Sequence, residues 1–412
     1  MLKLEPQIIT LPNGLRVVYL RSETLVSHLG VTVLAGSRFE NEREIGLAHF
    51  LEHCIFKGTK KRKAYHVLSR LDSVGAELNA YTTKEEICIY SAFSNEHLQR
   101  ATELLADITF NSSFPEKEIE KEKEIILDEI NSYLDNPSER IFDDFESYLF
   151  PDHSLGYNIL GTPESVQSFD RNSLLNYVEK FFFPSNMVVS YVGNLSINKV
   201  LKTTEKYFGA QPEKRLDNNL SVLPIYKPFK KVLKESNYQS HILLGGLAPG
   251  INEPDRRVMT LITNVLGGPA LNSRLTLLIR EKYGYAYNVE ANYTPYQDVG
   301  YWSIYAGTDN RFLKKTLQLI YKELVRFCEV PMSQKQLKQA KTQLKGHLSL
   351  GLESNSGLML SLAKSLIMFN QIDTIQEIHN SIDEITSEDV QRVACKYFHK
   401  DVISELIFET KE

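Results

Sequence analysis

The order of predicted helices and strands in the first half of the chain recurs in the second half, and this repeat limits the possible folds most. The two stretches that correspond best are NYVEKFFFPSNMVVSYVGNL and QRVACKYFHKDVISELIFE, each of which predicts a helix, an aromatic cluster, a break and a final strand. Lys180 in the first aligns with Lys396 in the second, so the copies lie 216 positions apart. Because solenoid repeats are much shorter, about 20 to 50 residues, this period indicates a duplicated α+β domain.

Length and composition are consistent with two such domains. A chain of 412 residues exceeds what a single hydrophobic core usually organises. Residues 211–224, QPEKRLDNNLSVLP, are polar and without periodicity, so we interpret them as a linker between domains over 1–215 and 216–412. The net charge of -5 gives no reason to expect nucleic acid or an anionic membrane as a partner.

Two predicted strand pairs mark the first copy. The turn Pro12-Asn13-Gly14 separates IITL from LRVVYL, and Asn-Gly favours the positive φ that tight hairpins require. After Gly75, the alternating run ELNAYTTKEEICIYSAF predicts a second pair of strands.

Targeting signals and cysteine usage point to the cytoplasm. The first 20 residues have no cationic segment followed by an apolar run, so no secretory signal is expected. Eighteen consecutive apolar residues occur nowhere, so no membrane-spanning helix is expected. The cysteines are far apart and form no C-x-x-C pair, which favours reduced thiols, and we interpret each as a small core residue. They are Cys54, Cys88, Cys328 and Cys395.

The stretch GLAHFLEHCIFKGT carries the chemistry that the repeat does not explain. It spells H-x-x-E-H, with His49, Glu52 and His53 within little more than one helical turn. On a helix, residues three and four apart share a face, so two imidazoles can hold Zn²⁺ while the glutamate is free to act as a base. The alternative is a core helix with two structural histidines, and five residues alone do not decide between them.

A second stretch, PEKEIEKEKEIILDEINSYL, is so charged that a solvated helix is the default interpretation. On a helical wheel, however, Glu122 and Glu129 fall on the apolar stripe, while Glu120, Glu124 and Asp128 point away. The stripe is formed by Ile119, Ile126, Ile130 and Tyr133. Buried carboxylates need a partner or a metal ion. A cation held by His49 and His53 would be such a partner.

Several segments in the same order resemble the pitrilysin and insulinase type of inverzincin zinc metallopeptidase. The likeness is strongest to the short branch that includes mitochondrial processing peptidase and bacterial homologues. It implies two duplicated α+β domains, each a mainly antiparallel sheet flanked by helices, that enclose a chamber. The segments are LPNGLRVV, GSRFENEREIGLAHFLEHCIFKGTKKR, LNAYTTKEE, EKEIILDEI, GYNILGTPESVQSF, PSNMVVSYVGNL and SRLTLLIREKYGYAYNV.

The resemblance also implies roles for single residues near the motif. The family's third zinc ligand is a glutamate about 76 positions past the second histidine, which is Glu129 here, and Glu122 matches an accompanying glutamate that supports the site. With His49, His53 and Glu129 as ligands, Glu52 would move the proton of the attacking water. The second half has no H-x-x-E-H, so metal chemistry is expected in the first half alone.

Further residues are expected to hold the substrate. Arg280 and Tyr287 match a family arginine and tyrosine that grip the substrate backbone, although a helix-end arginine and a strand tyrosine would be ordinary structural residues. The segment LNAYTT resembles an edge strand that pairs with an extended peptide. Its candidate substrate-binding residues are Asn79, Ala80, Tyr81 and Thr82. For Asn79, a turn or strand-capping role is an equal alternative.

These features lead to one functional hypothesis and two alternatives. The first is a zinc endopeptidase acting on peptides or unfolded segments, and as a homodimer, because the zinc motif and the Arg280–Tyr287 pair occur in one chain. The second is a non-catalytic assembly or chaperone-like subunit, although such relatives typically lose a ligand or the base. The third is a zinc hydrolase of non-peptide amides, since the same water would attack any carbonyl.

Overall fold

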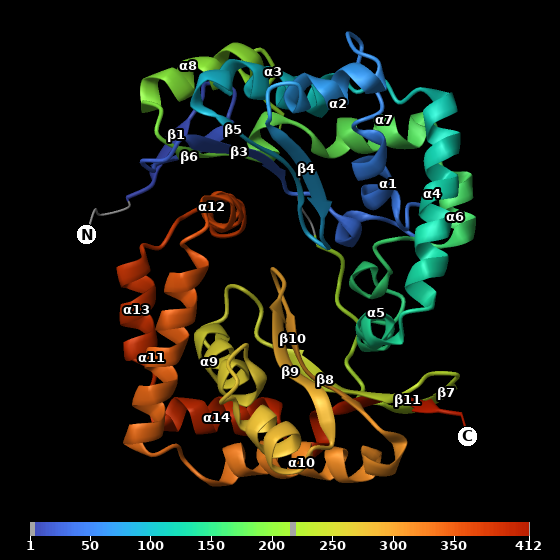
Figure 1. Cartoon of the computed structure of the whole chain (residues 1–412), viewed down its shortest axis with the longest axis vertical. Helices are drawn as coiled ribbons and strands as arrows, with labels where there is room; N and C mark the ends of the chain where they lie inside the picture. Colours follow the sequence, from blue (N-terminus) through green and yellow to red (C-terminus); the bar gives the residue numbers. More distant parts are fainter. Residues whose placement is uncertain (1–4, 215–219, 412) are drawn as a thin grey trace. The chain divides into compact units, whose positions relative to one another are not determined.

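The chain forms two compact units in the computed structural model, which describes residues 5–214 and 220–411 (Figure 1). The first unit comprises Met1–Ser132, Tyr157–Val222 and Gly351–Thr374, and the second comprises Tyr133–Gly156, Leu223–Leu350 and Ile375–Glu412. The boundary expected between positions 215 and 216 lies outside the described residues. Each unit draws on segments from both sides of that boundary, which the linear division by sequence did not anticipate.

The first unit is built on a six-stranded sheet of order β1-β2-β6-β3-β5-β4. Only β2 and β6 run parallel; the other neighbours are antiparallel. Both predicted strand pairs are confirmed, and Gly14 in the first turn has a φ of 87°. The strands are β1 (Gln7–Thr10), β2 (Arg16–Arg21), β3 (Val26–Val33), β4 (Glu77–Thr82), β5 (Ile87–Ser94) and β6 (Met187–Gly193).

The second unit repeats this arrangement with a five-stranded sheet of order β7-β11-β8-β10-β9. Here β7 and β11 are the parallel pair, and β11 is antiparallel to β8, as β6 is to β3. The strands are β7 (Lys230–Glu235), β8 (Ser240–Ala248), β9 (Ala286–Pro295), β10 (Gly300–Thr308) and β11 (Ser404–Thr410).

The duplication seen in the sequence is therefore confirmed by topology. Helix α7 (Arg171–Phe181) begins 216 positions before helix α14 (Ser387–Tyr397). The first leads into β6, which pairs in parallel with β2, and the second leads into β11, which pairs in parallel with β7. Both units are α+β domains on mainly antiparallel sheets, as expected.

Helices cover both faces of the first sheet. Those from the N-terminal half enclose one large core, and α12 packs on the opposite face against β2, β3 and β6 (Figure 1). The helices of this unit are α1 (Leu47–Cys54), α2 (Ala64–Asp72), α3 (Leu98–Asn111), α4 (Glu116–Leu134), α6 (Pro163–Ser168), α7 (Arg171–Phe181), α8 (Ile197–Phe208) and α12 (Asn355–Phe369).

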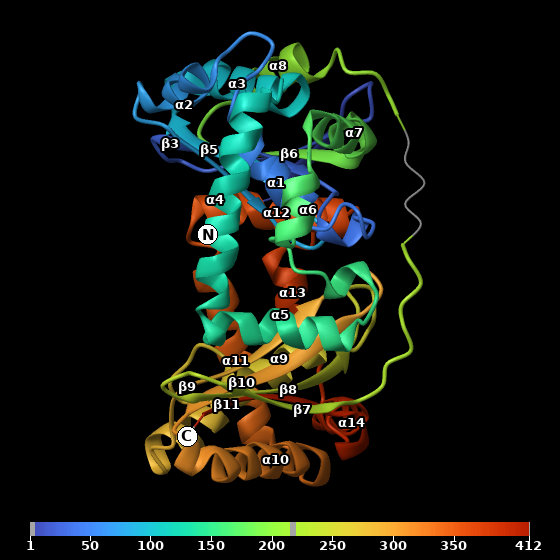
Figure 2. The same ribbon diagram turned by 90° about the vertical axis from the view of Figure 1, so that its right-hand side faces the viewer.

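The second sheet is covered in the same way, with α5 on the face opposite its other helices (Figure 2). Thus α5, from the N-terminal half, belongs to the second unit, and α12, from the C-terminal half, belongs to the first. The helices are α5 (Pro137–Leu149), α9 (Arg256–Gly267), α10 (Leu313–Glu329), α11 (Gln334–Gly351), α13 (Ile375–Asp383) and α14 (Ser387–Tyr397).

This exchange explains why the central strands are buried on both faces. Every residue of β6 and of β10 is buried, so neither strand has the alternation of buried and exposed residues that a sheet with one solvated face shows. The packing is close: a Cβ on Gly30 of β3 would lie 2.5 Å from Sδ of Met359 in α12. None of the helices formed by the described residues is long and apolar enough to cross a membrane.

The packing of α12 gives a test of the exchange. Met359 is fully buried, so Met359→Ala leaves a cavity above β3 and should destabilise the first unit by about 2 to 5 kcal/mol. The control is Ser361→Ala on the exposed face of the same helix, for which a change within about 0.5 kcal/mol is expected. Hydrogen exchange of β3 and β6 amides, followed by mass spectrometry, should accelerate in Met359→Ala only. Unchanged exchange there would contradict the packing.

Candidate metal centre

Helix α1 carries the H-x-x-E-H motif and is anchored at its first turn by a buried carboxylate. Glu40 accepts hydrogen bonds from the backbone N–H groups of Gly46, at 2.9 Å, and Ala48, at 2.7 Å. Backbone N–H groups at a helix start have no acceptor within the helix, and Glu40 supplies one. Gly46 has a φ of 92°, and a Cβ there would lie 2.5 Å from the Cα of Gly161. These contacts fix where α1 begins and hence where its histidines point.

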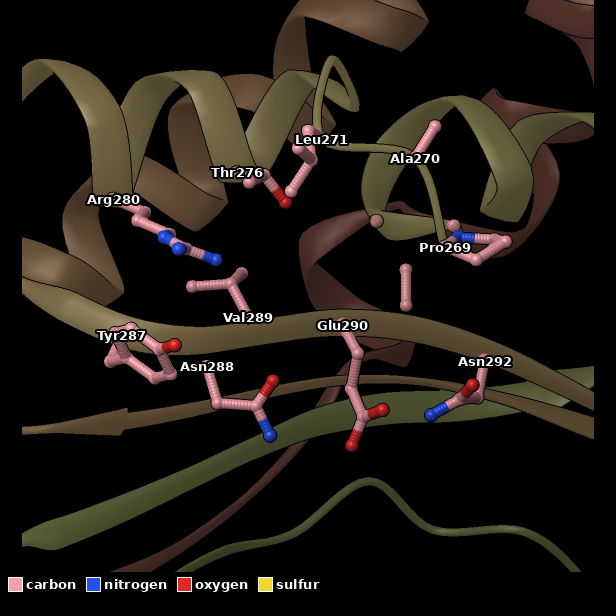
Figure 3. Close-up of a pocket in the computed structure, with 13 residues that line it drawn as sticks. Pro269, Ala270, Leu271, Thr276, Arg280, Tyr287, Asn288, Val289, Glu290 and Asn292 are labelled. Atoms are coloured by element: carbon pink, nitrogen blue, oxygen red, sulfur yellow. The ribbon is translucent and has the colours of Figure 1, made fainter. Parts of the chain in front are cut away.

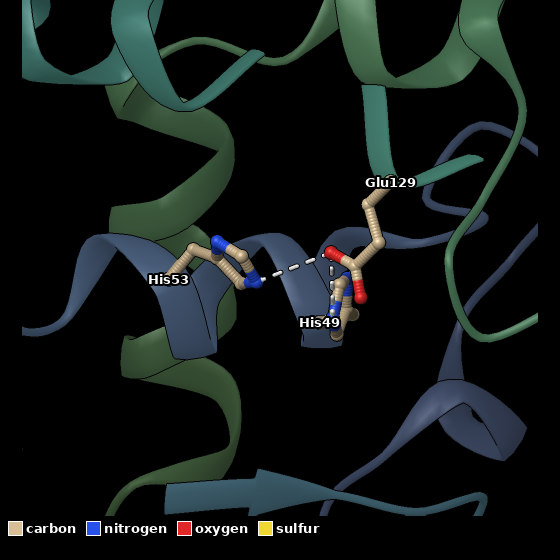
Figure 4. Close-up of side chains that lie close together, drawn as sticks. All are labelled: His49, His53 and Glu129. Carbon is tan, nitrogen blue, oxygen red and sulfur yellow. Dashed lines mark ion pairs between the residues drawn. The ribbon is translucent and has the colours of Figure 1, made fainter. Parts of the chain in front are cut away.

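His49, His53 and Glu129 converge on one point (Figure 4). Oε2 of Glu129, on α4, lies 3.9 Å from Nε2 of His49 and 3.6 Å from Nε2 of His53. Both separations are too long for hydrogen bonds but close to the roughly 3.4 Å between two ligands of a tetrahedral zinc ion. One donor atom from each residue lies within 4.8 Å of the others. Two imidazoles and a carboxylate in this arrangement fit a zinc ion with three protein ligands.

The protonation of His49 suits a metal ligand. Burial and the neighbouring His53 lower the pKa of His49 to about 4, so its ring is neutral at neutral pH. The neutral imidazole is the form with a lone pair available for a metal ion. Its Nδ1 atom is buried and has no hydrogen-bond partner in the described part of the chain.

His53, in contrast, is oriented by a carboxylate on its far side. Its Nδ1 atom lies 3.2 Å from Oε2 of Glu122, and Oε1 of Glu122 lies 2.7 Å from Nζ of Lys57. Glu122 is buried, so the Lys57 ammonium supplies the opposite charge that a buried carboxylate requires. A carboxylate at Nδ1 places the ring proton there and leaves Nε2 free to face Glu129.

Glu52 lies between the two histidines in sequence and against strand β4 in space. Burial raises the pKa of Glu52, while the hydroxyl and amide of Thr82 and the nearby His53 act in the opposite direction. A carboxylate with a raised pKa is a stronger proton acceptor than an exposed one. Glu52 thus lies beside the cluster with a raised proton affinity, and its role as a base stays a prediction.

Strand β4 lies at the edge of the first sheet and in contact with α1. One side of β4 pairs with β5, and no strand of the described chain pairs with its other side. Asn79, Ala80, Tyr81 and Thr82 all lie on this strand, so the expected edge position is confirmed. Their binding roles stay predictions. Tyr81 also has a structural contact, since its hydroxyl donates to Oε1 of Glu86 at 3.0 Å.

Arg280 and Tyr287 lie side by side in the second unit (Figure 3). Arg280 is on a seven-residue π-helix, Thr276–Lys282, and its guanidinium carbon is 4.5 Å from the ring centroid of Tyr287 on β9. The two residues line a pocket of about 340 Å³ that also presents polar side chains of β9. Insertion of a π turn is frequent at functional sites. The predicted pair is thus brought together, and its catalytic role stays a prediction.

The structure adds two residues that the sequence analysis did not identify and refines a third. Lys57 lies just past the end of α1 and forms the ion pair with Glu122. Glu40 stood in a loop without an assigned role; an acidic residue shortly before a helix start was the available signal. Glu129 was expected to be buried like Glu122, but its side chain is 43% exposed, which leaves solvent access to the cluster.

Comparisons with known proteins agree with this geometry. Residues 16–163 match the family described as insulinase (peptidase family M16), and residues 168–344 match the domain described as the peptidase M16 inactive domain. An uncharacterised zinc protease of Bacillus subtilis, YmxG, is 35% identical over 401 residues and covers 97% of both chains. The β subunit of mouse mitochondrial-processing peptidase is 30% identical over 410 residues, which span 96% of this chain and 82% of the relative.

Two solved structures share the fold over nearly the whole chain. A protease from Helicobacter pylori superposes with a TM-score of 0.90 at 22% identity, covering 98% of this chain and 99% of the other. A Pseudomonas fluorescens structure described as a peptidase M16 inactive domain gives 0.92 at 20% identity, covering 99% of each chain. Sequence relatives over almost the full length, with the duplicated fold, show that this chain belongs to peptidase family M16, the insulinase family.

Proposed function

We propose that the protein is a zinc-dependent endopeptidase that hydrolyses peptides or unfolded polypeptide segments. The observation that carries the proposal is the convergence of His49, His53 and Glu129 on one point, with Glu52 on the same short helix as the two histidines. The relatives named as zinc proteases support the same conclusion. A non-catalytic subunit would have no need of a complete ligand set together with a base.

Each residue has a role that follows from its position. His49, His53 and Glu129 would hold the zinc ion, Glu122 would orient His53, and Lys57 would hold Glu122 in place through their ion pair. A bound zinc ion would supply Lewis acidity, which lowers the pKa of water and polarises the scissile carbonyl.

Proton transfer and substrate positioning would fall to other residues. Glu52 would take a proton from the attacking water and return it to the leaving amine. The free edge of β4, at positions 79–82, would pair with the substrate backbone. Arg280 and Tyr287 would grip the substrate and assist the tetrahedral intermediate.

Substitution of the base tests the reaction. In Glu52→Gln the side chain can no longer accept the proton, so hydrolysis of a peptide mixture should fall by at least about 100-fold while zinc content is unchanged. Chelator should abolish wild-type cleavage, and added zinc should restore it. Glu42→Gln, an exposed glutamate in the loop before α1, is the control and should keep full activity. Wild-type protein without chelator-sensitive cleavage would refute the peptidase proposal.

Substitution of the orienting carboxylate tests the metal centre without relying on activity. Glu122→Gln removes the charge that pairs with Lys57 and faces Nδ1 of His53, so zinc affinity should fall by about 10- to 100-fold. The affinity would be measured by competition with a chromogenic chelator. Glu124→Gln, on the exposed face of the same helix, should bind zinc as wild type does. Equal affinities for the two variants would contradict the proposed support of His53.

We also propose that the protein works as a homodimer in the cytoplasm. Because the zinc cluster and the Arg280–Tyr287 pair occur in one chain, no inactive partner is needed to complete the set. The absence of a C-x-x-C pair among the cysteines supports a reducing compartment.

Light scattering during size-exclusion chromatography tests the assembly. Because two copies of one 47.2 kDa chain form the proposed enzyme, its mass should be twice that value, with peptidase activity in the same fractions. A monomer, or activity that appears only when a second protein is added, would rule out a self-sufficient homodimer.

A further inference from the structure

Two cysteines that are far apart in sequence lie on neighbouring helices of the second unit. Cys328 is in the last turn of α10 and Cys395 is near the end of α14, and the two helices pack together. The sequence analysis interpreted all four cysteines as core residues. That interpretation is wrong for Cys395, which is exposed, and Cys328 is only half-buried. Both are therefore within reach of small reagents.

A helix end explains why the thiols are close. The carbonyl groups in the last turn of α10 have no partner within the helix. The carbonyl oxygen of Cys328 accepts from Sγ of Cys395 at 3.2 Å and from Nε2 of Gln391, also on α14, at 2.9 Å. Cys395 thus donates its S–H to the backbone carbonyl of Cys328, and the thiol of Cys328 is its neighbour. Burial and the nearby Cys395 thiol raise the pKa of Cys328 to about 12.

The other two cysteines provide a contrast within the same chain. Cys54 and Cys88 are buried in the first unit, and burial raises the pKa of both thiols. Buried thiols in apolar surroundings are inert, whereas exposed thiols react with oxidants. Reactivity should therefore be confined to Cys395, with Cys328 as the thiol beside it.

We propose that Cys328 and Cys395 form a reversible disulfide when a low-molecular-weight disulfide such as oxidised glutathione accumulates. The Cys395 thiolate attacks one sulfur of the oxidant, whose S–S bond breaks and releases one molecule of reduced thiol. The Cys328 sulfur, after losing its proton, then attacks Sγ of Cys395 in the mixed disulfide and releases the second. The two protein thiols lose two electrons and two protons, and the oxidant becomes two thiols.

The position of the bond gives it a structural effect. Between the two cysteines the chain forms α11, α12 and α13, and α12 belongs to the first unit. The disulfide would join two points of the second unit that lie on either side of the segment Gly351–Thr374, which belongs to the first unit. Closing so large a loop restricts the unfolded chain more than closing a short one. Oxidation should therefore stabilise the protein, while Gln391 keeps the Cys328 carbonyl paired.

The test uses full-length wild-type protein incubated with excess oxidised glutathione, then blocked with an alkylating agent and digested for mass spectrometry. The expected product is a peptide pair joined through Cys328 and Cys395, lighter than its parts by two hydrogen atoms, with Cys54 and Cys88 alkylated only after denaturation. Dithiothreitol should reverse it. A stable glutathione adduct on Cys395 without the cross-link, or a bond between two chains, would overturn the proposal.

A second measurement separates the cross-link from simple modification. Oxidised wild-type protein should melt about 5 °C higher than reduced protein, whereas Cys395→Ser treated in the same way should show no rise. Cys395 is exposed, so its replacement by serine should leave the reduced protein's melting temperature unchanged. A cross-link without any rise in melting temperature would refute the proposed stabilisation by loop closure.

Discussion

Inner strands of both sheets are buried on both faces, and the rest of the architecture follows from the need to cover them. A sheet with one solvated face would alternate apolar and polar residues, but β6 and β10 are buried throughout. Each sheet therefore needs a helical layer on each side. One layer comes from helices close in sequence, and the other is a single helix, α12 or α5, from the opposite half of the chain. The halves of the chain are thus linked by exchanged helices as well as by the segment between them.

Burial also determines how the charged and titratable side chains of the candidate metal centre are arranged. Glu122 is buried, and it is stabilised by Lys57 on one side and His53 on the other. His49 is kept neutral by burial, and Glu129 remains partly exposed. The helix that carries the histidines is in turn held by Glu40 at its first turn. Ligand geometry in this site is therefore supported by groups that would not touch the metal ion.

Much of this could be predicted because the signals were local or periodic. The spacing in H-x-x-E-H places His49 and His53 on one helical face, and the seven-residue step from Glu122 to Glu129 places both on another, whatever the fold. The hairpins and the 216-residue repeat also depend only on sequence order. Lys57 and Glu40 were not identified because their partners are set by the packing of separate elements, and a charge near a helix end has many possible partners. The same limit applied to Cys328 and Cys395, which are brought together by the packing of α10 on α14.

The sequence by itself determined the duplication, the identities of the candidate ligands and base, and the edge strand beside them. The duplication, the two histidines and the base depend on spacing along one element or on the order of elements. The third ligand and the edge strand were implied by the resemblance to a known family. Tertiary structure alone decided which unit α5 and α12 join, that Lys57 faces Glu122, and how far each glutamate is exposed. These outcomes depend on which surfaces pack together, and an apolar helix face has the same sequence pattern whichever sheet it covers.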